Sequence, residues 1–277
     1  MTEPKSLLKH YLHENYNWML QSNGDHLTIV SGKEGSGKSA FAVWAALELN
    51  PDFDSKKQVV YDLKSLMNFF DAYQGVKGRV CIVDEAVLIA MGEDSQTKES
   101  KLLKQVFITH RDLGHMYFMV SPSPFLLSPY MRNWRAKDFY LIYGNPTTVE
   151  DIRYVAYYTR KAYAPMICSP HGKQQIMFPW DFVRTHKPTH IEYFPLPKGD
   201  KYDKVFDEVF EMKKEAQSRL RQKIDDIQNQ DAPQQSDTEL RNKYIKNSIN
   251  YGLKTKDASV IFGVSVRTIE RIITTAT

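Results

Sequence analysis

Cysteine is scarce in this sequence: only two of its 277 residues are cysteines, Cys81 in an apolar run and Cys168 in a loop-like segment. Two isolated thiols form no disulfide framework and no zinc-ligand spacing, which is typical of a reducing compartment. Long hydrophobic runs are also missing, because no apolar stretch approaches the roughly 18 residues of a membrane-spanning helix. No N-terminal signal pattern is present. We therefore expect a cytoplasmic protein without membrane insertion.

Net charge is absent from most of the chain. The formal charge is +4, from 37 basic and 33 acidic residues. Residues 238–277 hold seven of the basic and three of the acidic side chains, which leaves thirty of each sign for residues 1–237. All of the net positive charge therefore lies in the last forty residues, where it indicates a nucleic-acid contact.

Glycine is concentrated where an apolar run ends, in the segment 28–41, TIVSGKEGSGKSAF. Residues 32–39 match the phosphate-loop pattern G-x-x-x-x-G-K-[ST] at every fixed position, with a predicted strand before them and a predicted helix after them. Glycines allow the backbone N–H groups to turn inward toward a phosphate, and the helix adds its positive N-terminal end. The alternative is an ordinary glycine-rich turn. The expected nucleotide-binding residues are Gly32, Lys33, Glu34, Gly35, Ser36, Gly37, Lys38, Ser39 and Ala40.

Within this loop, Lys38 is expected to contact the β- and γ-phosphates of ATP, and the Ser39 hydroxyl is expected to bind Mg²⁺. About fifty residues further on, four apolar residues end in Asp84 and Glu85. A carboxylate at the tip of a buried strand is where a second Mg²⁺ ligand is needed, and Asp84 fits that role. The adjacent Glu85 is a candidate catalytic base for the water that attacks the γ-phosphate. The alternative is a pair of solvated acids at a strand end.

Strands and helices alternate from residue 26 onward, which predicts an α/β fold with a mostly parallel sheet and flanking helices. Expected strands lie at 26–30, 58–62, 79–84 and 115–121, and expected helices at 38–49, 64–73 and 98–112. Two tyrosine-rich strands, 138–143 and 152–159, are expected to form a hairpin at one edge of the sheet. Their aromatic side chains could stack on bases, but half-buried strands also favour tyrosine, and the core reading is preferred.

The C-terminal quarter is organised differently. A long amphipathic helix is expected from residue 201, with an apolar stripe that includes Val205, Phe206 and Phe210. The polar segment 224–238 has almost nothing to bury and is expected to be a linker. The predicted domains are therefore an ATPase domain at 1–223, the linker at 224–238 and a small all-α domain at 239–277.

That small domain resembles a helix-turn-helix in its centre, DASVIFGVSVRTIERI. Ser259 takes the small position where two helices approach, Gly263 makes the turn, Val264 is buried and Ser265 caps the second helix. Ile269 and Ile272 are expected to face the core. A small helical bundle that binds protein is the alternative. The residues expected to contact DNA are Ser265, Val266, Arg267, Glu270 and Arg271.

Three segments together resemble the FtsK–HerA superfamily of P-loop ATPases: SGKEGSGKS, VCIVDEA and FITHRDLGHMYFMVSPSPFLL. The nearest resemblance is to viral packaging and zonular-occludens-toxin-like ATPases of phages, archaeal viruses and plasmids, and it covers about half of the chain. It implies the additional-strand, catalytic-glutamate (ASCE) type of P-loop fold. In that family a strand ends in a polar sensor residue, often glutamine or asparagine, and here the position is Ser121.

The resemblance further implies a homo-oligomeric ring, often a hexamer, in which an arginine of one subunit reaches the nucleotide of the next. Arg111 is the first candidate for that arginine, and Arg132 and Arg135 are the runners-up; the alternative for each is a surface arginine. The partners implied are double-stranded DNA and a capsid, portal or conjugation component, in the host cytoplasm if the chain is viral.

Three functions follow from these features. The first is an ATP-hydrolysing motor that translocates or packages DNA. The second is an ATP-switched DNA-binding protein, such as a transposition helper, replication loader or regulator, in which ATP controls assembly. The third is a small-molecule kinase with a DNA-binding tail, which Glu85 disfavours because a kinase has no water to activate.

Overall fold

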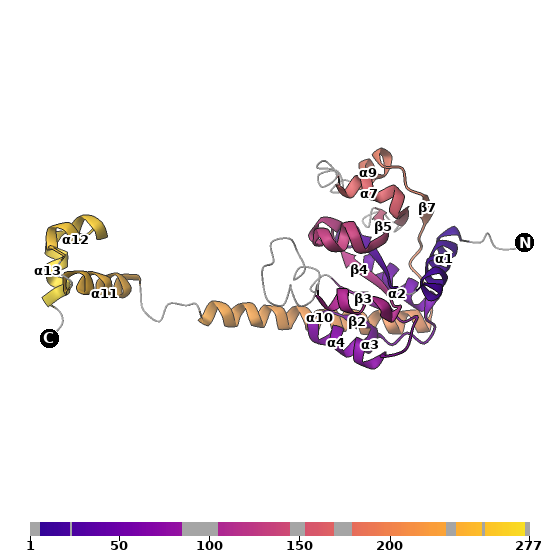
Figure 1. Cartoon of the computed structure of the whole chain (residues 1–277), viewed down its shortest axis with the longest axis horizontal. Coiled ribbons are helices and arrows are strands. Elements are labelled where there is room, and N and C mark those ends of the chain that lie inside the picture. The colour runs from indigo at the N-terminus through magenta and orange to yellow at the C-terminus, as the bar shows by residue number, and fades with distance from the viewer. Residues whose placement is uncertain are drawn as a thin grey trace, which may run out of the picture. The chain divides into compact units, whose positions relative to one another are not determined.

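The structure is a computed structural model that describes residues 6–22, 24–84, 105–144, 153–168, 179–230, 237–250 and 253–274. The chain divides into two compact units, Met1–Gln217 and Ser218–Thr277 (Figure 1). The catalytic candidate Glu85 lies outside the described residues, as does the first part of the helix expected at 98–112.

The first unit is built on one mixed sheet. In the described part of the chain its seven strands have the order β2-β3-β4-β1-β5-β6-β7. Strands β2, β3, β4, β1 and β5 pair in parallel, and β6 and β7 pair antiparallel. Their bounds are β1 His26–Ser31, β2 Val59–Val60, β3 Val80–Val83, β4 Met116–Ser121, β5 Ala136–Gly144, β6 Arg153–Thr159 and β7 His190–Tyr193.

The predicted α/β class with a mostly parallel sheet is confirmed, and this fold is consistent with a P-loop NTPase. The expected tyrosine-rich hairpin is also present, as β5 and β6. Its expected position at the sheet edge is wrong, because β7 pairs with β6 and forms the outer strand. Segment 165–198 has too little regular periodicity for β7 to be predicted from the sequence.

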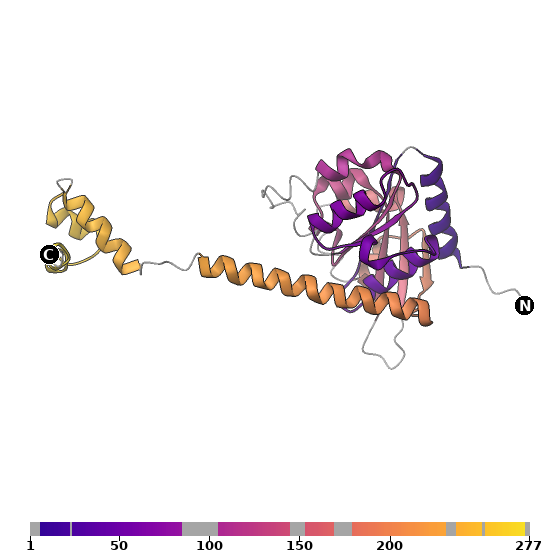
Figure 2. The same cartoon turned by 90° about the horizontal axis from the view of Figure 1, so that it is seen from below.

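Helices cover both faces of the sheet (Figure 2). On one face pack α1, α2 and α10; on the other pack α4, α7 and α9 with short turns η2 and η3. The bounds of the helices and helical turns of this unit are α1 Leu7–Gln21, α2 Lys38–Leu49, α3 Ser55–Gln58, α4 Leu63–Ala72, η1 Arg111–Leu113, η2 Pro124–Leu126, η3 Tyr130–Arg135, α7 Arg160–Cys168, α9 Pro179–Thr185 and α10 Asp200–Gln230.

The strands are apolar on both sides because helices cover both sides. In β3, Val80 and Ile82 face the α2 layer, whereas Cys81 and Val83 face the α4 layer. All four side chains are almost completely buried. A continuous apolar run is what a parallel strand with two covered faces requires, and it explains why period-two alternation is absent from this part of the sequence.

The inserted strand β4 lies between β1 and β3. Because β1, β4 and β3 are parallel, their carboxyl ends lie together at one end of the sheet. Register pairs Ser31 at the end of β1 with Ser121 at the end of β4. Asp84 follows β3 directly, and its N–H donates to the Val60 carbonyl of β2 at 3.1 Å. The phosphate-loop segment, Ser121 and Asp84 therefore all lie at the carboxyl ends of the strands.

At the amino ends of the strands, an ion pair and a histidine–aspartate contact are buried. Arg135 donates hydrogen bonds to the Asp25 carboxylate and to the Phe107 carbonyl. His26 lies 3.2 Å from Asp138. Burial raises the pKa of Asp25, and the Arg135 guanidinium opposes that shift. Arginine and carboxylate buried together fix the geometry of this end, since either one alone would be an uncompensated charge.

In its described residues the C-terminal unit contains the end of α10 and three shorter helices, α11 Asp237–Asn250, α12 Thr255–Phe262 and α13 Val266–Thr274. Gly263 has φ 63°, a left-handed conformation suited to the turn between α12 and α13. The core is formed by Ile245, Ala258, Ile269 and Ile272.

The burial of the two isoleucines expected in this core is confirmed, and so is the Ser265 cap, whose hydroxyl accepts the Thr268 N–H at 3.2 Å. The small residue in the core is Ala258 rather than the expected Ser259, and Val264 is only partly buried.

The helix α10 continues to Gln230, well into the segment 224–238 that was expected to be a linker, and α11 begins at Asp237. Segment 224–230 contains no glycine or proline, and the first helix breaker after it is Pro233. Nothing in its sequence therefore stops the helix, even though it has little to bury. Among the described helices, none is long and apolar enough to cross a lipid bilayer.

We predict that His115 makes the protein less stable as pH falls. This histidine is buried against Phe69 and Tyr117, and burial lowers its pKa to about 4 from an ordinary 6.5. The unfolded chain therefore binds a proton that the folded chain does not between pH 6.5 and 4, and folding is penalised by an amount on the order of 2 to 3 kcal/mol at the lower limit.

The substitution His115→Leu removes the proton-binding group while keeping similar volume. Urea unfolding of wild type and variant at pH 7 and pH 4.5 measures the effect, and contributions common to both proteins cancel in the difference. The variant is expected to lose less stability than wild type over this interval. Equal losses in the two proteins would contradict the assignment.

Candidate functional site

The phosphate-loop sequence connects β1 to α2 with the geometry that its glycines require. Gly35 and Gly37 have φ of 73° and 94°, and Gly37 is the N-cap of α2, which begins at Lys38. A Cβ on Gly32 would lie 2.2 Å from the Ile142 carbonyl oxygen of β5 and 2.6 Å from the Ser36 hydroxyl. The loop can therefore follow this path only with glycine at position 32.

Two polar side chains of the loop are buried. The Lys38 ammonium donates to the Lys33 carbonyl at 3.0 Å, and its side chain is almost fully buried. The Ser36 hydroxyl is buried and has no hydrogen-bond partner among the described residues. A buried hydroxyl without a protein partner is costly unless a ligand or water satisfies it, which fits a loop that holds an anion.

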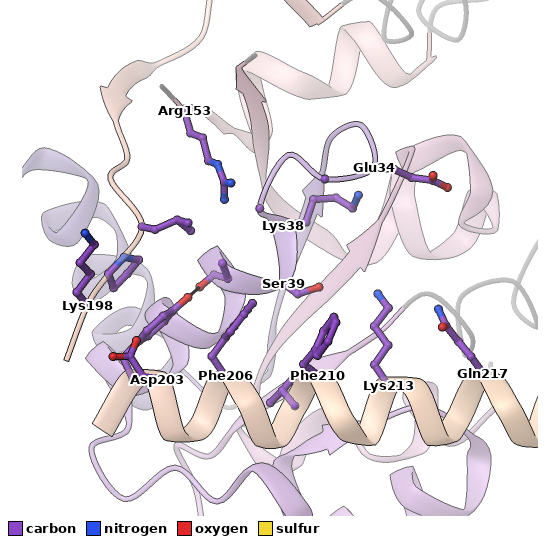
Figure 3. A pocket seen from close by; sticks show the side chains of 17 residues that line it. Glu34, Lys38, Ser39, Arg153, Lys198, Asp203, Phe206, Phe210, Lys213 and Gln217 are labelled. Atoms are coloured by element: carbon purple, nitrogen blue, oxygen red, sulfur yellow. Dashed lines mark hydrogen bonds between the residues drawn. The ribbon is translucent and has the colours of Figure 1, made fainter. Parts of the chain in front are cut away.

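Next to the loop is a cavity of about 760 Å³, and α10 forms its second wall. Figure 3 shows Lys38 and Ser39 on the loop side and Phe206, Phe210 and Lys213 projecting from α10. The two ends of the cavity differ. One end is mostly apolar, with Leu196, Pro197, Tyr202 and Phe206, and it also holds the charged Lys198 and Asp203. The other end is polar and is lined by Glu34, Lys38, Ser39, Lys213 and Gln217 (Figure 3).

Helix α10 is held in this place by contacts along its length. The Tyr202 hydroxyl donates to the Ala40 carbonyl of α2 at 3.2 Å, and the Tyr61 hydroxyl donates to the Val209 carbonyl at 2.9 Å. Val205 and Val209 are buried in the core under the helix. Burial raises the pKa of Tyr61 well above its ordinary range, so its hydroxyl remains a donor.

At the polar end, the Lys213 ammonium lies 3.1 Å from Asp84 Oδ1 and 3.3 Å from Asp84 Oδ2. The Asp84 side chain is 2% exposed, and that of Lys213 is 24% exposed. The carboxylate predicted to bind Mg²⁺ is therefore buried and already holds a cation. An aspartate carboxylate and a serine hydroxyl are hard oxygen ligands of the kind that Mg²⁺ takes, so Asp84 and Ser39 fit the metal by their chemistry.

Arg153, the first residue of β6, also lines the cavity (Figure 3). A Cβ added to Gly37 would lie 2.5 Å from one of its terminal guanidinium nitrogens. The guanidinium therefore sits against the phosphate loop, and Gly37 leaves the space for it. Sequence analysis missed both Arg153 and Lys213.

A weak signal for Lys213 does exist in the sequence. Phe206, Phe210, Lys213 and Gln217 follow one another at helical spacing, so the polar pair continues the apolar stripe on the same face. A stripe that changes from aromatic to polar along one face indicates a surface that is apolar at one end and meets polar groups at the other. No comparable signal marks Arg153.

Ser121 lies beside the phosphate loop, at the end of β4, as expected for a sensor position. Its hydroxyl is buried and donates to the Ser123 carbonyl at 2.8 Å. The side chain therefore braces the following turn, and its predicted role toward nucleotide stays a prediction.

The three candidate arginines lie away from this cavity. Arg111 is in the 3₁₀ turn η1, after the helix rather than at its end, and lines a separate hollow at the amino end of the strands with Trp18 and Trp134. Arg132 donates to the carbonyls of Phe125 and Leu127. Arg135 is buried in its ion pair with Asp25, which gives it a structural role in this chain.

The residues predicted to contact DNA lie in and just before α13. Ser265, Arg267, Glu270 and Arg271 line one hollow of about 570 Å³, together with Thr268 and Thr274. Arg267, Glu270 and Arg271 are exposed, as expected, whereas Val266 is partly buried. The polar side chains therefore share one surface of the C-terminal unit.

Comparisons with known proteins give little beyond this geometry. No protein-family model and no curated protein match the chain. One similar solved structure is the N-terminal domain of zonular occludens toxin from Neisseria meningitidis, at 19% identity and TM-score 0.40, covering 66% of this chain and 98% of that domain. Another is the RuvB Holliday junction branch migration motor of Thermotoga maritima, at 15% identity and TM-score 0.34, covering 99% of this chain and 88% of that protein. Both similarities are low, so they identify neither a family nor a function.

We predict that Gly32→Ala disrupts the phosphate loop without unfolding the sheet. The new methyl group would meet the Ile142 carbonyl, so the loop must shift away from β5. Nucleotide affinity should fall at least about tenfold, because each loop residue whose N–H no longer points toward the phosphates loses a hydrogen bond to the nucleotide. Calorimetric titration with ATP measures the affinity. Gly24→Ala is the control, since a Cβ there meets nothing within 4 Å; equal affinity in both variants would contradict the prediction.

Proposed function

We propose that the chain is a Mg²⁺-dependent P-loop ATPase of the additional-strand type that moves or packages double-stranded DNA. The observation that supports it most directly is the cavity between the loop and α10, with Lys38 and Ser39 at one end and apolar side chains at the other. The insertion of β4 between β1 and β3 supports the additional-strand type.

The two ends of the cavity give the bound ATP an orientation. Its phosphates would lie along the loop, with the terminal phosphate toward Ser39 and Asp84, the residues that would hold Mg²⁺ and let it neutralise phosphate charge. Its base lies in the apolar end, between Leu196, Pro197 and the rings of Tyr202 and Phe206. Arg153, seated on Gly37, adds a positive charge beside the phosphates.

Glu85 remains our proposed catalytic base, because it follows Asp84 directly in the sequence. An acid next to the metal ligand can orient and deprotonate the attacking water. The position of Arg111 is compatible with action on a neighbouring subunit. It lies before the amino end of β4, whereas the phosphate loop lies past the carboxyl end of the adjacent β1, and six residues of strand span about 20 Å. The Arg111 side chain is therefore out of reach of the nucleotide site in its own chain, so any contact with nucleotide would have to be made to a neighbouring subunit.

The C-terminal unit is proposed to be a helix-turn-helix domain that contacts DNA through α13. The tight turn at Gly263, the capped start of α13 and the exposed Arg267 and Arg271 support this role. The net charge of the chain lies in residues 238–277, so long-range attraction to DNA phosphates would act through them.

We predict that duplex DNA stimulates ATP turnover and that Glu85→Gln nearly abolishes it, by on the order of 10²- to 10⁴-fold, while ATP still binds. Phosphate release with and without DNA measures turnover, and Lys38→Ala is the binding-deficient control. Displacement of a third strand from a triplex tests movement along DNA. Stimulated turnover without strand displacement would favour the ATP-switched DNA-binding protein over the motor. Turnover of Glu85→Gln within about threefold of wild type would contradict the assignment of Glu85 as the catalytic base.

We further predict that replacing Arg267 and Arg271 together by alanine weakens DNA binding and makes it less dependent on salt. Each lost phosphate contact lowers the slope of log K against log salt by about 0.9. Fluorescence anisotropy at several salt concentrations measures both quantities, with circular dichroism to verify folding. Lys56→Ala with Lys57→Ala is the control, because it removes two exposed charges from the first unit. Unchanged affinity and slope in the arginine variant would show that this surface binds something other than DNA.

A further inference from the structure

We propose that Lys213 of α10 binds the terminal phosphate of the nucleotide, and that its ion pair with Asp84 is the resting position from which Mg²⁺ releases it. This inference rests on the proposed nucleotide site. It adds a residue that lies outside the phosphate loop and outside the strand that supplies the metal ligand.

The resting contact is well defined. The ammonium is almost equidistant from the two Asp84 oxygens, at 3.1 and 3.3 Å, so it lies across the carboxylate rather than beside it. Asp84 is nearly inaccessible to water. A buried carboxylate without a cation is strongly disfavoured, and Lys213 supplies the positive charge.

Mg²⁺ and the Lys213 ammonium compete for the same two carboxylate oxygens of Asp84. Mg²⁺ binds carboxylate oxygens at about 2.0–2.1 Å with strict octahedral geometry. The ammonium covers both oxygens from about 3 Å, and two adjacent cations repel each other strongly in a site shielded from water. Entry of the metal therefore displaces the ammonium from at least one oxygen.

The displaced lysine remains in the cavity because its helix is anchored. Tyr61 holds the Val209 carbonyl one turn before Lys213, and Ser55 donates to Glu208 at 2.5 Å. Only the flexible side chain is then free to reorient. Figure 3 shows it projecting from α10 into the cavity, on the side where Ser39 lies. This is the end at which the proposed function places the terminal phosphate.

A terminal phosphate beside Mg²⁺ is the anion best placed to receive this ammonium. Lysine binds phosphate as a compact point charge with three donors, and charge-assisted hydrogen bonds of this kind are stronger than neutral ones. Glu34 also lines the cavity and is the competing acceptor within the protein. A contact to phosphate, unlike a contact to Glu34, distinguishes a triphosphate from a diphosphate.

The test compares affinities for a non-hydrolysable ATP analogue and for ADP, both with Mg²⁺, by calorimetric titration. Lys213→Gln is expected to weaken binding of the triphosphate by about tenfold or more and of ADP by less than about twofold, because one charged hydrogen bond is lost only from the triphosphate. Lys213→Arg should restore most of the preference. Lys204→Gln is the matched control, since Lys204 is an exposed lysine of the same helix outside the cavity lining.

A second measurement addresses the resting ion pair. Mn²⁺ replaces Mg²⁺ and is followed by electron paramagnetic resonance without nucleotide. Lys213→Gln should bind Mn²⁺ more tightly than wild type, because the metal no longer competes with an ammonium for Asp84. Equal Mn²⁺ affinity in the two proteins would overturn the resting-position part of the proposal.

Loss of Lys213 leaves a buried carboxylate without its cation, so the single variant could fold poorly. The pair Asp84→Asn and Asp84→Asn with Lys213→Gln avoids this, because neither contains the buried charge. Adding Lys213→Gln to the Asp84→Asn background should again reduce triphosphate affinity more than ADP affinity, measured without metal. Equal losses for both nucleotides in the two backgrounds would overturn the phosphate contact.

The outcomes separate the two proposals. If wild type binds neither nucleotide and Lys38→Ala changes nothing, the nucleotide site itself is wrong. If wild type binds both, Lys38→Ala abolishes binding and Lys213→Gln leaves the preference for triphosphate unchanged, only the role of Lys213 is wrong.

Discussion

A carboxylate buried at the end of a strand must have a cation beside it, and the candidate site is arranged around that requirement. Asp84 ends β3 at the edge of the sheet where β1 and β4 also end. The cation in this structure is the Lys213 ammonium, delivered by a helix more than a hundred residues further along the chain. The packing of α10 on the sheet therefore sets the electrostatics at Asp84, because moving the helix would take the Lys213 ammonium away from the buried carboxylate.

The two ends of the strands are built differently. At the amino ends, the Arg135 guanidinium is buried and hydrogen-bonded to the Asp25 carboxylate and the Phe107 carbonyl. At the carboxyl ends, glycines allow the phosphate loop to turn, and α10 forms the far wall of a cavity. The Arg135–Asp25 ion pair fixes the amino ends of the strands, so side chains at the carboxyl ends can be positioned for a ligand. This separation also explains why two arginines that look alike in the sequence have different roles. Arg135 is buried at the amino ends of the strands, and Arg153 lines the cavity at the carboxyl ends.

The net charge of the chain is concentrated at its C-terminal end. The first 237 residues are electrically balanced, and the excess of positive charge lies in residues 238–277, which include α12 and α13. The balanced first 237 residues give little long-range attraction to nucleic acid, so association with DNA would be governed by the last forty residues and would depend on salt. Under the proposed function, recognition of DNA and use of nucleotide would then be carried by separate parts of one chain.

The sequence by itself determined the local features: the loop from Gly32 to Ser39, the start of α2 at Lys38, the strand that ends before Asp84 and the cap at Ser265. Each depends on a few consecutive residues, since a left-handed glycine, an apolar run or a capping hydroxyl acts within one turn or one strand. The mostly parallel sheet followed from the alternation of such segments. The residues of α10 were predicted as an amphipathic helix, but not as a wall of the site.

Only the tertiary structure decided which side chains meet across the cavity. Lys213 and Asp84 are 129 residues apart, and their contact depends on how α10 packs against α2 and Tyr61 rather than on any nearby residue. The same holds for Arg153 on Gly37, for Arg135 in its ion pair and for Ala258 in the small core. Charged side chains look alike in a sequence because their local preferences are weak. Whether one is buried, paired or exposed is set by the elements that fold around it.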